Sequence, residues 1–205
     1  MGFALAWVAV KGRPVSEILR ELRLRPTGAR SLEGEVPFVG ALLDTGWYLI
    51  VMPGGDRLEH YEKTTHPVLA PSVLARLSSN CQVVTCSVEE HVIFSQATGW
   101  RNGERVWTVT HEPQTLDEEG TLPAEYAQLR DRLVAQQEAE GGASADVDSL
   151  FEIPVVLVQT FVGYKHDEVN RALEAQGGFD VLESDASTTA KPSFLGRLFK
   201  RRPSA

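Results

Sequence analysis

The dipeptide Asn102-Gly103 is flanked by two segments rich in β-branched and aromatic residues, CQVVTCSVEEHVIFSQATGWR before it and ERVWTVTHE after it. Asparagine and glycine both tolerate the positive φ that a type I′ turn needs at its two central positions. Such a turn joins two antiparallel strands through a two-residue loop. The sequence therefore predicts a β-hairpin within residues 81–112.

A two-residue loop also predicts which residues of the hairpin face each other. Arg101 faces Glu104 and Trp100 faces Arg105, and the same register places Thr98 opposite Trp107. Because side chains alternate across a strand, one side of the hairpin gathers the large rings and is assigned to the core. That side carries Phe94, Trp100, Trp107, Val109 and His111, and the other carries His91, Ile93, Ser95, Ala97, Thr108, Thr110 and Glu112.

Residues 87–99 also allow a helical interpretation. Ser87 and Glu90 have the spacing of a capping box, and an apolar stripe follows at helical intervals. We favour a strand, since the Asn-Gly turn needs a strand on both sides and residues 104–111 are poor helix formers.

The remaining pattern predicts an α+β fold, a mainly antiparallel sheet of five or six strands with helices packed on one or both faces. Residues 26–45, apart from a short edge strand within 36–43, and residues 112–122 are predicted as loops. Residues 151–164 suit a buried helix or a strand, and we favour the helix because Pro154 fits a first turn. Further strands are expected at 3–10, 47–52, 81–88 and 179–183, and further helices at 15–24, 72–77, 123–140 and 165–176, the last with Val169 and Leu173 facing inward.

Charge divides the chain into two parts. The net charge is −8 over 205 residues, but residues 184–205 hold one acidic residue against five basic ones, a local +4. We therefore expect a single globular domain at 1–183, with a net charge of −12, and a flexible basic tail at 184–205. An acidic body argues against a nucleic-acid surface. It suits a protein partner that is basic in charge.

Cysteine usage bears on the compartment. Cys81 and Cys86 lie five residues apart in a predicted strand, so they point to opposite faces and do not pair. Two buried thiols fit a reducing compartment. The apolar start of the chain is short and lacks a preceding basic region, so it predicts a first strand and not a signal peptide. A cytoplasmic location follows as the expectation.

The predicted polar side of the hairpin supplies the candidate catalytic residues. His91 and Glu112 lie near each other there, with Glu90 adjacent. A histidine beside carboxylates can serve general acid–base chemistry or bind a divalent metal. No H-x3-H, HExxH or C-x2-C spacing is present, so we expect no metal and no cofactor. Solvated cross-strand residues are the favoured interpretation, and His111 is expected to be a hydrogen-bonded core residue.

Two further segments carry candidate sites. His166 and Asp167 form either a functional pair or an ordinary helix entry. In the tail, an apolar side flanked by basic residues resembles a short interfacial anchor. A disordered solubilising tail is the favoured interpretation, and docking into a partner's groove is a third. The tail residues that would contact a membrane or partner are Phe194, Leu195, Leu198 and Phe199, with Arg197, Lys200 and Arg201 around them.

These observations predict a non-catalytic binding or accessory protein that engages a macromolecular partner through an acidic surface. A small acidic protein with an aromatic hairpin and no catalytic motif resembles bacterial immunity and accessory proteins in general type. A small metal-assisted or acid–base hydrolase using His91 and nearby carboxylates is one alternative. A peripheral membrane protein tethered by its tail is another. The sequence leaves the oligomeric state open.

Overall fold

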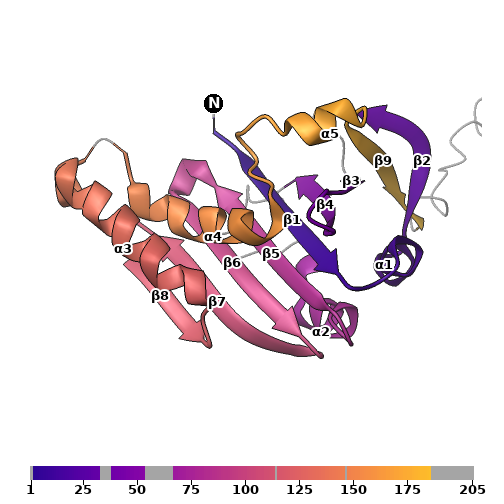
Figure 1. Cartoon of the computed structure of the whole chain (residues 1–205), viewed down its shortest axis with the longest axis horizontal. Helices are drawn as coiled ribbons and strands as arrows, with labels where there is room; N and C mark the ends of the chain where they lie inside the picture. Colours follow the sequence, from indigo (N-terminus) through magenta and orange to yellow (C-terminus); the bar gives the residue numbers. More distant parts are fainter. Residues whose placement is uncertain (1, 33–37, 54–66, 114, 146, 186–205) are drawn as a thin grey trace, which may run out of the picture.

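The computed structural model describes residues 2–32, 38–53, 67–113, 115–145 and 147–185. Within them the chain forms one antiparallel sheet of nine strands in the order β2-β9-β3-β4-β1-β5-β6-β7-β8 (Figure 1). The predicted α+β class is confirmed, and the predicted count of five or six strands is wrong. The strands are β1 (Ala4–Lys11), β2 (Leu24–Ser31), β3 (Phe38–Leu42), β4 (Tyr48–Pro53), β5 (Gln82–Glu89), β6 (Phe94–Arg101), β7 (Glu104–Glu112), β8 (Thr115–Gly120) and β9 (Phe179–Ser184).

The strands that sequence patterning missed are the two at the edges of the sheet. β2 contains Pro26 and Gly28 and is exposed along most of its length, and β8 is equally polar. An edge strand with little burial needs no alternating apolar pattern, so both segments look like loops in the sequence. The strand predicted within 36–43 does form, but as β3 it lies between β9 and β4 and not at an edge.

In the described ranges, five α-helices cover the two faces of the sheet. α3 (Ala124–Ala139), α4 (Glu152–Val162) and α5 (Arg171–Ala175) belong to one core, and α1 (Val15–Leu22) and α2 (Pro71–Leu77) to the other. In Figure 1, α3 and α4 lie in front of strands β5–β8. α4 confirms the helical interpretation of residues 151–164, and its buried side chains lie against β5, β6 and β7.

The helix predicted at 165–176 is much shorter than expected. Residues 163–170 are not helical, and α5 starts only where the Asn170 side chain accepts a hydrogen bond from the Leu173 amide. Leu173 is buried as predicted, whereas Val169 is 73% exposed and the prediction for it was wrong. The asparagine cap decides where this helix begins.

The hairpin forms with the predicted turn but with a shifted register. Arg101 faces Glu104 and Trp100 faces Arg105, yet Gly99 then faces Trp107, because Val106 is an extra residue on β7. A one-residue bulge moves every later partner to the other face. The predicted assignment of faces is therefore wrong for β6. Trp107, Val109 and His111 share their face of the sheet with Ser95, Ala97 and Gly99. Phe94 and Trp100 point to the other face.

Next to the bulge, the Trp107 indole lies against the backbone of Gly99. A Cβ atom at Gly99 would lie 2.1 Å from Trp107 Nε1, so the indole crosses the strand where there is no side chain. Glycine inside a strand often marks such a close approach.

The cysteines lie as predicted, on opposite faces of the sheet. Cys86 packs in the core under α3 and α4, and Cys81 packs in the core under α1 and α2. Both are free and buried. Burial raises the pKa of both thiols, and that of Cys86 most strongly. Protonated thiols are poor nucleophiles, so neither cysteine is suited to covalent catalysis.

Candidate functional site

The first candidate is a corner formed by Glu89, Glu90, His91 and His166, which we call the carboxylate–histidine corner. Residues 87–99 are strand on both sides of a short 3₁₀ turn, Glu90–Val92, so His91 lies in the turn and not on a strand. Its Nδ1 atom lies 2.9 Å from Glu89 Oε1. Glu112 ends β7 opposite Thr115. Among the described residues, no ion pair joins His91 to Glu112.

Glu90 is held by different partners. One of its carboxylate oxygens accepts a hydrogen bond of 2.9 Å from the Phe3 amide. The other lies 3.4 Å from Nε2 of His166, a residue 76 positions later in the chain. Sequence spacing gives no signal for a pair so distant. The histidine beside Glu90 is thus His166 and not His91.

His166 is enclosed by aromatic side chains. Its side chain is 1% exposed, its ring centroid lies 5.7 Å from that of Trp7, and Phe3 meets it edge-on at 5.1 Å. Its Nδ1 atom and Trp7 Nε1 are buried, and neither has a hydrogen-bond partner in the described parts of the chain. A general base must reach the proton it removes. The burial of His166 therefore favours a structural role, the attachment of residues 163–170 to the start of β1.

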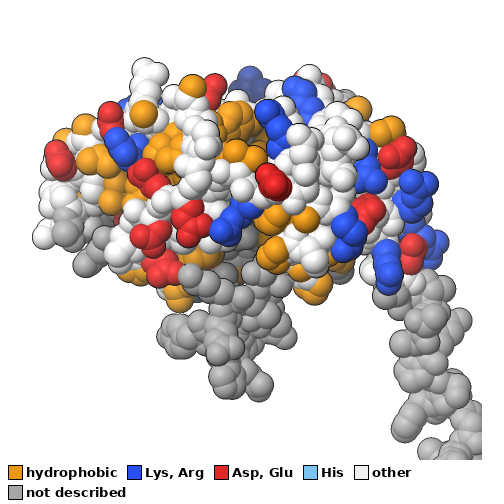
Figure 2. All heavy atoms as spheres, turned by 90° about the horizontal axis from the view of Figure 1, so that it is seen from below, with side chains coloured by type: hydrophobic (Ala, Val, Ile, Leu, Met, Phe, Trp, Pro, Cys, Tyr) orange, Lys and Arg blue, Asp and Glu red, His pale blue; other side chains and the backbone are white. Residues whose placement is uncertain are grey.

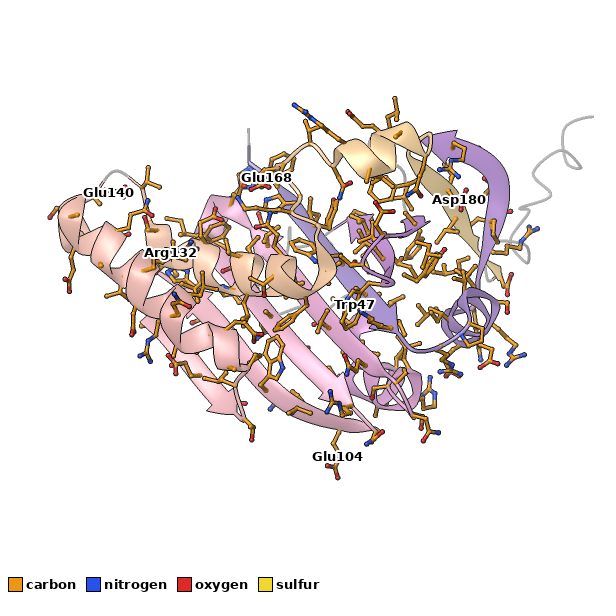
Figure 3. The ribbon with its side chains drawn as sticks, in the orientation of Figure 1. Trp47, Glu104, Arg132, Glu140, Glu168 and Asp180 are labelled. Atoms are coloured by element: carbon orange, nitrogen blue, oxygen red, sulfur yellow. The ribbon has the colours of Figure 1, made fainter. Side chains whose placement is uncertain are left out.

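Next to His166, Lys165 is surrounded by carboxylates. Its Nζ atom lies 3.1 Å from Glu152 Oε2, 3.0 Å from Asp167 Oδ2 and 3.9 Å from Glu168 Oε1. Figure 3 shows Glu168 on the loop above α4. Burial lowers the pKa of Lys165, but the hydrogen bonds to Asp167 and Glu152 outweigh it and the net shift is upward. A lysine that stays protonated cannot act as a base. We therefore interpret the ion pairs of Lys165 as a structural link between the loop and α4.

His111 is buried in the core, as predicted. Its Nδ1 atom lies 3.1 Å from the Ile93 carbonyl oxygen. Its Nε2 atom lies 3.2 Å from Asp148 Oδ2, although the alignment there is not that of a hydrogen bond. The side chain is fully enclosed, which favours a structural role over a catalytic one.

A second candidate is a hollow of about 300 Å³ on the α4 face of the sheet, near the hairpin turn; we call it the aromatic hollow. Trp107 lies across Gly99 there, and Phe161 of α4 lies 6.4 Å from Trp107, between ring centroids. The predicted hairpin register, with Trp100 and Trp107 on one face, gave no hint of this hollow. It is lined by Trp47, Gln82, Val83, Val84, Gly99, Trp100, Arg101, Val106, Trp107, Thr121, Pro123 and Phe161.

The third candidate is the acidic surface, which the structure concentrates at one edge of the sheet. Residues 112–140, which include β8 and α3, contain eight acidic residues against two arginines, a net −6. Residues 11–30 contain six basic against two acidic, a net +4. Acidic side chains are more frequent toward the left of Figure 2 and basic ones toward the right. We call the exposed acids on β8 and α3 the acidic edge: Asp117, Glu118, Glu119, Glu125, Asp131, Glu138 and Glu140.

Some carboxylates of the acidic edge are held in place. Glu118 accepts a hydrogen bond of 2.6 Å from the Tyr126 hydroxyl and is 3.4 Å from Arg130. Burial, and then the Glu118 carboxylate, raise the pKa of Tyr126. Glu119 pairs with Arg105 at 2.9 Å. The edge therefore combines fixed and solvated charges.

Comparison with known proteins gives no family assignment. No family model, no curated protein and no solved structure matches the chain. In the described parts of the chain, no three His, Cys, Asp or Glu side chains are grouped to hold a metal ion. No described helix is long and apolar enough to cross a membrane. The seven tail residues predicted to contact a partner or a membrane lie outside the described residues.

Proposed function

We propose that the protein is a non-catalytic binding or accessory protein that engages a basic macromolecular partner through its acidic edge. The observation that carries the proposal is the concentration of a net −6 on residues 112–140, at one end of the sheet. At the other end, Arg25 and Arg30 of β2 are paired with Asp180, Glu183 and Asp185. A surface of one charge sign raises the association rate with an oppositely charged partner and disfavours wrong partners.

The aromatic hollow supports the proposal by its position. Thr121 and Pro123 line it and directly follow β8, so the hollow adjoins the acidic edge. Binding energy in protein interfaces is often concentrated in aromatic pockets, while surrounding charges supply steering and specificity. We assign the acidic edge to recognition and the hollow to anchoring.

The competing enzymatic role has less support. His91 is 63% exposed and pairs with Glu89, while the histidine beside Glu90 is enclosed. Neither of the two hollows found among the described residues is lined by these groups or by Glu112. The membrane-tether alternative depends on the tail and stays a separate proposal.

The test is capture of a partner from a bacterial lysate by the full chain and by residues 1–185, followed by affinity measurement with charge variants. Asp117→Asn/Glu125→Gln/Glu138→Gln removes three exposed charges from the acidic edge. Asp44→Asn/Glu104→Gln/Glu174→Gln removes three exposed charges elsewhere and is the matched control.

We expect a basic partner that binds both chains, loses at least tenfold in affinity with the edge variant and is little affected by the control. Equal losses with the two variants would point to net charge alone and contradict the acidic edge. Capture by the full chain only would instead support the tail.

A further inference from the structure

The outer side of β8 is an open strand edge. β8 pairs with β7 along its whole length, and no described strand lies on its other side. The Thr121 amide donates to the Val106 carbonyl. This bond shows which residues of β8 direct their backbone N–H and C=O groups toward β7. In an antiparallel pair every second residue bonds to the partner, so Asp117 and Glu119 direct their backbone groups toward β7. Leu116 and Glu118 direct theirs outward.

The two edges of the sheet are protected in different ways, β2 by its backbone and β8 by the charges of Asp117, Glu118 and Glu119. β2 contains Pro26, and its register with β9 breaks between Pro26 and Arg30. Proline and bulges are the usual means of blocking strand addition. β8 has no proline, and its register with β7 is unbroken from Gly120 to Thr115.

The side chains of β8 determine what can pair with it. Asp117 and Glu119 lie on one face of the sheet and Glu118 on the other, so a strand beside β8 meets carboxylates on both faces. Like charges opposite each other destabilise a strand pair, and opposite charges stabilise it. Two β8 edges would repel each other, which disfavours a second copy as the occupant. A segment with lysine or arginine at alternate positions is complementary.

One carboxylate of this edge is held before any partner binds. The Tyr126 hydroxyl donates to Glu118, while the pair of Glu119 with Arg105 is exposed to solvent. Side chains that are fixed before binding lose less conformational entropy when the partner arrives.

We propose that β8 receives an extended, basic segment of the partner as a tenth strand of the sheet. This inference rests on the proposed function and deepens it, since it names the segment and the mode of recognition. Backbone hydrogen bonds to Leu116 and Glu118 would supply affinity, and the carboxylates would select lysine or arginine.

The test uses the full chain and two synthetic peptides. The first has the sequence Lys-Thr-Lys-Val-Lys-Thr-Lys. The second is identical but N-methylated at four consecutive central amides, so that its charge is kept and neither of its edges can pair. Affinities are measured by fluorescence anisotropy at low and moderate salt, and amide exchange of Leu116 and Glu118 by NMR.

We expect the unmodified peptide to bind at least tenfold more tightly than the methylated one and to slow exchange of both amides. Equal affinity with unchanged exchange would overturn strand addition while leaving an acidic binding surface in place. If neither peptide binds at low salt, the inference fails and the acidic edge loses its support. Protection of both amides before any peptide is added would mean that the chain's own tail or a second copy occupies the edge, which also overturns the inference.

Discussion

Gly99 leaves room for the Trp107 indole beside the bulge of the hairpin. The Trp107 indole occupies the space that a Cβ at Gly99 would need, and Val106 bulges from β7 beside it. Because the bulge reverses which residues of β6 face α4, Ser95 and Ala97 lie on the side of that helix, while Trp100 packs in the core under α1 and α2. The register of the hairpin thus sets which residues of β6 lie on each face.

Gly99→Ala should reduce the free energy of unfolding by about 1–3 kcal/mol, since overpacking forces side chains and backbone to shift. Urea denaturation measures this loss. The matched background is Trp107→Val, in which the added methyl group has room and the same substitution should cost much less. An equal cost in both backgrounds would show that the indole is not the cause.

Lys165→Met should destabilise the protein by about 1–2 kcal/mol at neutral pH, because it leaves Glu152 and Asp167 facing each other without their cation. Burial raises the pKa of Asp167, but Lys165 outweighs it and the net shift is downward. Stability from a lowered carboxyl pKa is present above the ordinary value of about 4 and disappears as the pH falls through the folded value. The difference between variant and wild type should therefore shrink toward pH 3.

Denaturation of both proteins at pH 7 and pH 3 checks this pH dependence. Lys165→Arg, which keeps the positive charge, is the control and should retain most of the stability. A difference that stays constant from pH 7 to pH 3 would assign the effect to the lost packing of the lysine stem.

At the scale of elements, sequence patterning succeeded where an element carries its own apolar signal. The strands β1, β4 and β5 and the helices α1 to α4 have such a signal, and all were predicted. β2 and β8 lack an apolar pattern. They are strands because they pair with β9 and β7, and the sequence of a single segment does not show this pairing. One contact of a candidate residue escaped prediction for a similar reason: Glu90 meets His166 across 76 residues of chain, a contact that spacing cannot reveal.

α4 and the loop after it offer a direct test of which apolar residues stabilise the fold. Leu157 is fully buried, and Val169 is 73% exposed although sequence patterning had placed it inside. Leu157→Ala should cost about 2–5 kcal/mol in the free energy of unfolding through the cavity it creates. Val169→Ala should change it by less than about 0.5 kcal/mol. A cost above about 1 kcal/mol at Val169 would mean that another surface covers it in solution.

At the scale of the molecule, the two cores share one sheet. β1 contributes Trp7 and Ala9 to the core under α4, and Val8 and Val10 to the core under α1 and α2. Loss of either core would leave the same strands covered on one face only. We therefore expect the two cores to unfold together.

Fluorine NMR of protein labelled with 5-fluorotryptophan measures this cooperativity. Trp7, Trp47 and Trp107 report on one core and Trp100 on the other. All four resonances, assigned with single Trp→Phe variants, should lose intensity at a common urea midpoint. A separate midpoint for Trp100 would show that the layer of α1 and α2 unfolds independently.

The position of β9 has a consequence for how the protein is made. Among the described strands, β2 pairs with β9 alone, and β9 also pairs with β3. This third of the sheet can therefore form only after residues 179–184 have been synthesised. At 5–20 residues per second, a ribosome needs roughly 10–30 s to synthesise the stretch from β2 to β9. During that time β2 has no strand beside it. The β2 sequence, LRPTGARS, is mostly polar and contains a proline, so it can stay solvated without pairing with an incorrect strand. The same composition explains why β2 was not predicted as a strand.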